Sequence, residues 1–204
     1  LCALCVYAYL PRGDRMKPTP EERHPEVATA RDLQVITIPD GKDGFLPAGT
    51  KVRVTQTLGT SYTVQVERGG KVRVHGEDGD AIGQAKLGSG KVVPTAQTVP
   101  AIAPAANQAL RKVFDPEIPV DIVNLGLVHE LVIEPKPGGT FNAKVRMGLT
   151  SPGCGMGDVL VRDVQAALGA IEGVSSVDAQ VVLFPVWNPY TMMSEAAKLK
   201  LGML

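Results

Sequence analysis

Residues 141–171 read FNAKVRMGLTSPGCGMGDVLVRDVQAALGAI, and this stretch decides the fold. Apolar and polar residues alternate over 141–149, which predicts a strand with one buried face. Over 157–170 the apolar residues recur at helical spacing and form one face, made of Leu160, Val164, Ala167, Leu168 and Ile171. A strand that passes through a short loop into an amphipathic helix indicates a sheet covered by helices.

The sequence on either side completes an α/β unit. An amphipathic helix is predicted from Ala106 to Val113, and it ends before Pro116 because the residue preceding a proline is pushed out of the α region. The other expected elements are strands over 128–134 and 177–184 and a last helix over 193–201. The order α-β-β-α-β-α over residues 105–204 predicts a two-layer α/β sandwich, with one small sheet and helices on one of its faces.

The N-terminal half has a different pattern. Over 31–85, short runs of alternating apolar and polar residues are separated by turn sequences, which predicts a small all-β domain and an α+β chain as a whole. Residues 86–104 contain prolines and glycines without a sustained period and are expected to form a linker. Residues 1–30 are expected to be a disordered or misassigned lead, because the chain begins with Leu and the stretch from Met16 is polar and rich in proline.

Composition limits the class of protein. A chain of 204 residues with 44% hydrophobic residues is long enough to bury a core and fits a soluble globular protein. Its 21 basic and 21 acidic residues cancel, which argues against a nucleic-acid partner bound through a broad basic surface. The apolar residues 1–10 are too few to span a membrane, which takes about 20 residues. We therefore expect no membrane partner. Three cysteines are too few for a disulfide framework, so we expect a protein of the reducing cytoplasm.

The loop TSPGCGMG over 150–157 carries the chemistry of greatest interest. It delivers Cys154 to the start of the predicted helix, where free backbone N–H groups and the helix dipole favour a negative charge. A thiolate formed there would attack electrophiles or bind metal. The alternative is a buried structural cysteine in a tight turn, and the spacing alone leaves both interpretations open.

Two other features are candidates for the same site. Asp115, Glu117 and Asp121 are carboxylates on or near a loop stiffened by proline, although such residues are more often capping and turn residues. Trp187 precedes the last predicted helix on an irregular segment, where a single Trp is more often part of the core than of a contact surface. His129 is expected to be a packed or edge residue of its strand.

Three runs carry a resemblance to a known family: FDPEIPVDIVNLGLVHEL over 114–131, MGLTSPGCGMGDVLVRDVQAAL over 147–168 and VWNPYTMMSEAAKLKLGML over 186–204. Together they resemble the domain shared by the SufT family, the phenylacetate-pathway PaaD proteins and the eukaryotic cytosolic iron-sulfur targeting factors. The preceding β domain, with IPDG and LPAGTKVRVTQTLGTSYTVQVE, looks like that of the long two-domain form of SufT. The resemblance extends over about residues 31–204.

The resemblance implies an auxiliary factor in the maturation of iron-sulfur proteins, with no established turnover reaction and hence no enzyme. It implies that Cys154 is the cysteine of the SPGC motif, and the residues around it form a supporting loop of Thr150, Ser151, Gly153, Gly155, Met156 and Gly157. The acidic motif maps to Asp115–Glu117, and the closing motif maps to Trp187, Pro189, Met193, Ser194 and Glu195. Of these, Trp187, Met193 and Glu195 are expected to face partners.

The sequence departs from the family pattern at two places. Phe184-Pro185-Val186-Trp187 stands where an Asp-Pro-Pro-Trp pattern is expected, so that a carboxylate and a proline are lost. His129 stands where a Tyr is usual. Either departure would alter the choice of partner.

The working hypothesis is that Cys154 is a thiolate ligand or transient acceptor for iron or a labile iron-sulfur cluster. Such clusters usually take four protein ligands, so a partner or a second protomer of a homodimer would supply the others. The expected partners are client apo-iron-sulfur proteins and the assembly machinery. The alternative is a metal-free adaptor that docks clients through Cys154, Trp187 and the acidic loop. An enzyme with Cys154 as nucleophile is a weaker hypothesis, because the sequence places no base beside it.

Overall fold

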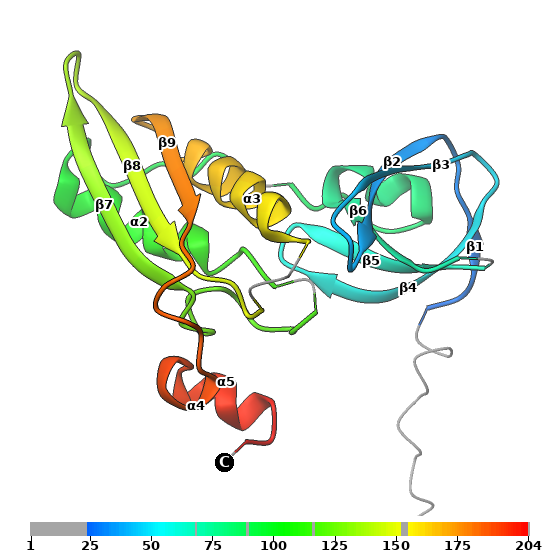
Figure 1. Cartoon of the computed structure of the whole chain (residues 1–204). Coiled ribbons are helices and arrows are strands. Elements are labelled where there is room, and N and C mark those ends of the chain that lie inside the picture. Colours follow the sequence, from blue (N-terminus) through cyan, green and yellow to red (C-terminus); the bar gives the residue numbers. More distant parts are fainter. Residues whose placement is uncertain (1–23, 68, 89, 116, 152–154, 204) are drawn as a thin grey trace, which may run out of the picture.

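A computed structural model describes residues 24–67, 69–88, 90–115, 117–151 and 155–203 of the chain. They form an N-terminal β domain followed by an α/β domain, as Figure 1 shows. The α+β class predicted from the sequence is therefore confirmed. No helix among these residues is long and apolar enough to cross a membrane.

The β domain is one antiparallel sheet in the order β1-β4-β5-β6-β2-β3. Its strands are β1 (Val27–Ala28), β2 (Leu33–Ile38), β3 (Asp43–Leu46), β4 (Lys51–Leu58), β5 (Ser61–Val66) and β6 (Lys71–His75). Alternate residues of the strands point into one core, which the 3-10 helix η1 (Gly76–Ile82) completes with Ala81 and Ile82. Strand β1 pairs with β4, so Val27 and Ala28, which lie in the 1–30 stretch expected to be a lead, belong to the sheet; residues 1–23 of that stretch lie outside the described residues.

Helix α2 (Val99–Leu110) begins earlier than the sequence pattern suggested. Its residues 99–104 lie inside the 86–104 range expected to be a linker, and that expectation is wrong for these residues. Pro100 is tolerated in the first turn, where the missing N–H would have no helical partner. Ile102 is fully buried together with Ala106 and Leu110, so burial of this face outweighs the cost of Pro104 inside the helix.

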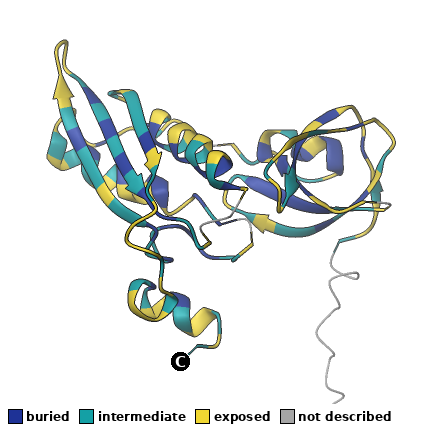
Figure 2. Cartoon of the chain, viewed as in Figure 1, coloured by how far each residue is buried: buried dark blue, intermediate teal, exposed yellow. Residues whose placement is uncertain are grey.

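The α/β domain has the predicted two-layer arrangement. Its sheet has the order β7 (Val128–Lys136), β8 (Thr140–Met147), β9 (Val174–Val181), with β7 antiparallel to β8 and β8 parallel to β9. Helix α3 (Gly157–Gly169) makes the crossover between the parallel strands and packs with α2 against the sheet. Alternate residues of β8 are buried beneath the helices, as the burial colours in Figure 2 show.

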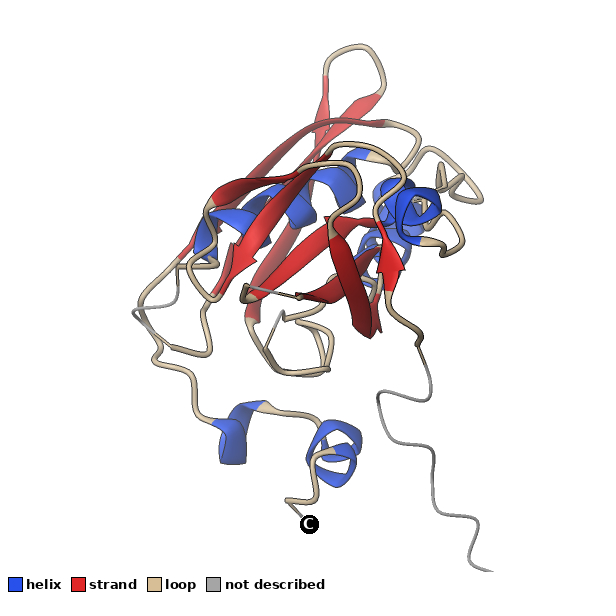
Figure 3. Ribbon diagram, turned by 90° about the vertical axis from the view of Figure 1, so that its right-hand side faces the viewer, coloured by secondary structure: helices blue, strands red, loops and turns tan. Residues whose placement is uncertain are grey.

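The C-terminal segment differs from the single helix expected over 193–201. It forms two short helices, α4 (Pro189–Met192) and α5 (Glu195–Lys200), which Figure 3 shows set apart from the sheet. The break occurs because Met193 adopts an extended backbone and Ser194 starts a new helix, where its hydroxyl accepts a hydrogen bond from the Ala197 N–H.

Candidate functional site

The candidate site begins where two parallel strands end at the same edge of the sheet. The loop over 148–156 leaves β8, and the segment over 182–188 leaves β9 beside it. The Val182 N–H donates a 2.8 Å hydrogen bond to the Met147 carbonyl and joins the two exits. Cys154 and Gly153 lie outside the described residues, so the predicted ligand role of Cys154 stays a prediction.

The structure brings the acidic loop to the cysteine-bearing loop through Asp115. This carboxylate is only 5% exposed. Its Oδ1 accepts hydrogen bonds of 2.9 Å from the backbone N–H groups of Glu117 and Ile118, which folds the loop back on itself. Its Oδ2 accepts a hydrogen bond of 3.3 Å from the hydroxyl of Thr150. Two motifs that were predicted separately are therefore in contact.

The three carboxylates of the acidic motif do not converge. Glu117 is exposed, whereas Asp121 is buried and accepts hydrogen bonds from the backbone and side chain of Asn124. Asp121 therefore organises its own turn. Across the described ranges, no group of three His, Cys, Asp or Glu side chains is arranged to hold a metal ion.

The described loop residues on either side of Cys154 divide between exposed and buried positions. Ser151 and Gly155 are exposed. Met156 is only 2% exposed and forms a small apolar cluster with Val159 of α3 and Ile36 of β2. Met156 is thus an anchor between the two domains, and Gly157 is the first residue of α3.

Comparison with known proteins identifies the α/β domain. Residues 105–181 match the family described as iron-sulfur cluster assembly protein. The chain is 39% identical over 95 residues to the Fe-S protein maturation auxiliary factor of Porphyromonas gingivalis, a match that covers 47% of this chain and 86% of the relative. The chain belongs to the iron-sulfur cluster assembly family. The resemblance drawn from the sequence is therefore confirmed for the α/β domain.

The comparisons found further similar proteins. The auxiliary factor SufT of Staphylococcus aureus is 39% identical over 90 residues, which is 44% of this chain and 97% of that protein. A solved structure of a domain of unknown function (DUF59) from Bacillus anthracis is 35% identical, covers 52% of this chain and 95% of its own, and has a TM-score of 0.44. A conserved hypothetical protein of Thermotoga maritima is 33% identical, with coverages of 48% and 92% and a TM-score of 0.41. The β domain lies outside the matched family region.

The closing motif of this family member serves mainly to attach the C-terminal helices. The indole N–H of Trp187 donates a 2.7 Å hydrogen bond to the Leu125 carbonyl. Ser194 binds Asn124 through both its backbone N–H and its hydroxyl, each at 2.9 Å. Met193 is only 5% exposed, so the prediction that it faces partners is wrong, because its side chain fills the core. The third residue predicted to face partners, Glu195, is exposed.

An exposed apolar run beside the site was not predicted from the sequence. After β9, large apolar side chains stand in solvent with exposed fractions of 63% for Leu183, 79% for Phe184, 57% for Val186 and 73% for Tyr190. The signal was available in the sequence, because Leu183, Phe184 and Val186 place three large apolar residues within four positions after the last strand. Exposed apolar side chains that gather in one place are typical of interaction surfaces.

His129 lies against the start of the loop over 148–156. Its Nε2 atom is buried and has no hydrogen-bond partner among the described residues. A Cβ placed on Gly148 would lie 2.7 Å from that nitrogen, which shows how closely the two residues approach. The register of β7 and β8 shifts at this position, so His129 departs from the regular alternation of its strand.

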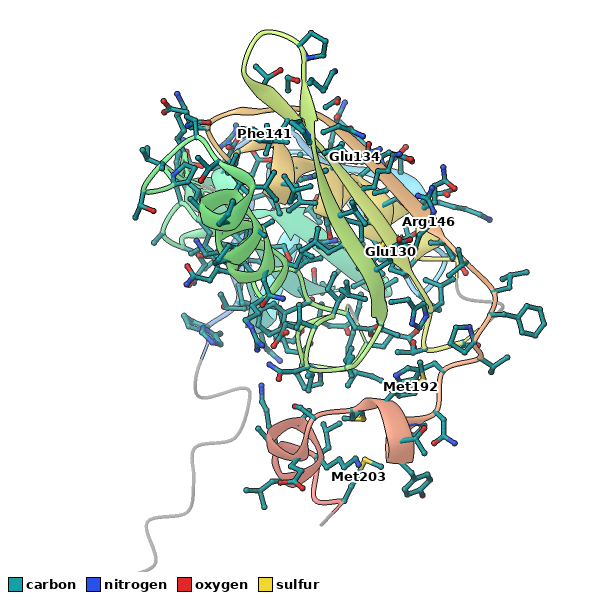
Figure 4. The ribbon with its side chains drawn as sticks, turned by 90° about the vertical axis from the view of Figure 1, so that its left-hand side faces the viewer. Glu130, Glu134, Phe141, Arg146, Met192 and Met203 are labelled. Atoms are coloured by element: carbon teal, nitrogen blue, oxygen red, sulfur yellow. The ribbon has the colours of Figure 1, made fainter. Side chains whose placement is uncertain are left out.

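The uncovered face of the sheet carries charged side chains, among them Glu134 and Arg146, which Figure 4 labels. The Lys144 ammonium donates a 2.7 Å hydrogen bond to Glu134, and Arg146 donates one of 3.4 Å to Asp178. The Lys144 hydrogen bond, with a second from Asn142, lowers the pKa of Glu134 below its ordinary value. The hydrogen bond from Arg146 likewise lowers the pKa of Asp178. The opposite charges within each of these two pairs neutralise one another.

Proposed function

We propose that this chain is an auxiliary factor in the maturation of iron-sulfur proteins, which assists cluster assembly or transfer to client apo-proteins through Cys154. The observation that carries the proposal is the 39% identity to three relatives named Fe-S protein maturation auxiliary factors, over 86% to 97% of their lengths. The proposed role is that of a helper without a turnover reaction, acting in the cytoplasm.

In this proposal, the Cys154 thiolate binds iron or a cluster as cargo. The residue precedes helix α3, whose N-cap Met156 makes no side-chain capping hydrogen bond. The backbone N–H groups of a helix start favour the thiolate over the thiol. The hydrogen bond of 3.3 Å from Thr150 to Asp115 supports this proposal, because it ties the acidic loop to the cysteine-bearing loop.

A single cysteine supplies too few ligands for a resident cluster. A cluster usually takes four protein ligands, and the described residues supply no further group of metal-binding side chains. We therefore propose that the cargo is shared with a client, with a component of the assembly machinery or with a second protomer. Weak, shared ligation suits a protein that passes its cargo on.

Anaerobic reconstitution with iron and sulfide tests the ligand role. The comparison uses a Cys2→Ser/Cys5→Ser background, so that Cys154 is the one thiol left, and adds Cys154→Ser to it. The proposal predicts charge-transfer absorption and bound iron in the background protein and their loss in the triple variant. Equal iron and sulfide contents in the two proteins would remove Cys154 as a ligand.

A second candidate function is a metal-free adaptor that docks client apo-proteins. The exposed apolar run at Leu183, Phe184 and Val186 favours it, because burying these side chains against a partner would stabilise the complex. Replacing Phe184 by Asp restores the acidic residue of the family pattern and removes the apolar contact. An adaptor predicts colourless protein after reconstitution, together with client binding that Phe184→Asp weakens and Cys154→Ser leaves intact.

A further inference from the structure

A turn of the β domain packs directly against the loop that follows Cys154. Gly41, in the turn between β2 and β3, has φ +67°, and a Cβ added to it would overlap the carbonyl oxygen of Gly155. In the other direction, a Cβ on Gly155 would lie 2.5 Å from the carbonyl oxygen of Asp40. Backbone touches backbone here, so neither position has room for a side chain.

A second turn of the β domain packs against the segment that leads to Asp115. Gly59, between β4 and β5, has φ +56°. A Cβ on it would overlap the carbonyl oxygen of Lys112 and lie 3.1 Å from the ring of Phe114. The β domain thus touches both loops that the hydrogen bond between Asp115 and Thr150 joins.

The contact between the domains is also held by charge and by apolar packing. Arg73 of β6 and Asp163 of α3 form an ion pair of 2.5 Å, with side chains only 12% and 16% exposed. Ile36 packs with Met156. Beside this ion pair, a cavity of about 200 Å³ lies between the two domains, and its lining includes Arg73, Asp163 and Lys112. The domains therefore meet at a few tight points, two of which are the glycine turns.

We propose that the β domain is a positioning element for the candidate site, and that Gly41 and Gly59 are its positioning residues. By holding Gly155 from one side and the Lys112–Phe114 segment from the other, the two turns set how the cysteine-bearing loop and the acidic loop face each other. The consequence for cargo binding rests on the proposed function. The mechanical consequence does not, because it concerns the order of the two loops alone.

The test compares Gly41→Ala and Gly59→Ala with Gly49→Ala in the full chain. Gly49 is a matched control, because it also lies in a turn of the β domain with positive φ, +83°, but nothing lies within 4 Å of its Cβ position. Urea unfolding first establishes that each variant is folded. Amide hydrogen exchange over 148–158 and 111–121 then reports on the two loops, and peptide-resolved alkylation of Cys154 across a pH series reports on its thiol.

We expect Gly41→Ala to raise the rate of amide exchange over 148–158. It should also change the pH profile of Cys154 alkylation, with a change of about fivefold in the alkylation rate at pH 7. Gly59→Ala should raise exchange over 111–121, and Gly49→Ala should do neither. Asp163→Asn, which weakens the contact between the domains without touching either loop, should act in the same direction if a glycine variant fails to fold. Loop exchange and thiol reactivity equal to those of Gly49→Ala would overturn the proposal. If the loops respond as expected but the wild type binds no iron, the proposed function is overturned and the positioning role of the β domain stands.

Discussion

The hydroxyl of Thr150 donates a hydrogen bond of 3.3 Å to the Asp115 carboxylate, which joins two loops that are 35 residues apart in sequence. The same carboxylate accepts two backbone N–H groups, so its removal leaves three donors without this partner. We expect Asp115→Ala to lower the free energy of unfolding by about 3 kcal/mol and Thr150→Val by about 1 kcal/mol. Urea unfolding measures both. The exposed neighbour Glu117→Ala is the control, and an equal loss there would contradict this assignment.

The ion pair between Arg73 and Asp163 is expected to couple the two domains. Because both side chains are mostly buried, a double-mutant cycle with alanine should give a coupling energy of about 1.5 kcal/mol. The pair of Arg162 and Asp43 also joins α3 to the β domain, but its side chains are 51% and 80% exposed. Its cycle should give less than about 0.5 kcal/mol. Similar coupling in the two cycles would show that burial does not strengthen the first pair.

Gly126 is expected to be required for attachment of the C-terminal helices. It has φ +73°, and a Cβ on it would overlap the Met192 carbonyl oxygen of α4. Gly126→Ala should therefore cost about 3 kcal/mol of unfolding free energy and expose Trp187, which fluorescence reports. Gly138→Ala is the control, because Gly138 has φ +88° and open space around it, so only the backbone cost of about 1 kcal/mol remains. An equal cost at the two positions would mean that α4 moves away freely.

The charge pairs on the open sheet face predict a dependence on pH. The pKa of Glu134 is lowered by Lys144, so this carboxyl stabilises the fold above its ordinary pKa of 4.5 and loses that effect as the pH falls through the lower folded value. Lys144→Met should raise the pKa of Glu134 towards 4.5. An NMR titration of the Glu134 carboxyl carbon measures it, and an unchanged pKa in the variant would show that Lys144 is not the cause.

Regular patterns made the α/β domain predictable from the sequence. Helix α3 begins at the predicted Gly157, and β8 alternates through Phe141 and Val145 as expected, because burial on one face imposes a period on the sequence. The first turns of α2 were missed because Pro100 and Pro104 look like a linker, although the buried Ile102 decides their conformation.

Contacts between distant loops leave no periodic signal. The approach of Gly41 to Gly155 depends on how two domains dock, and each glycine alone looks like an ordinary turn residue. The burial of Met193 was missed for a similar reason, because it follows from the attachment of Trp187 and Ser194 to the segment around Asn124. Sequence reasoning therefore found the motifs of the site but not how they are held together.

The most direct test of the central claim is cluster transfer measured in vitro. A scaffold protein loaded with an iron-sulfur cluster is mixed anaerobically with an apo-ferredoxin, and the recovery of ferredoxin absorption is followed with and without this chain. We predict that the wild type accelerates recovery several-fold and that Cys154→Ser, shown to be folded, does not. A wild type that leaves the rate unchanged, or a Cys154→Ser variant that is equally effective, would contradict the claim that this chain assists maturation through Cys154.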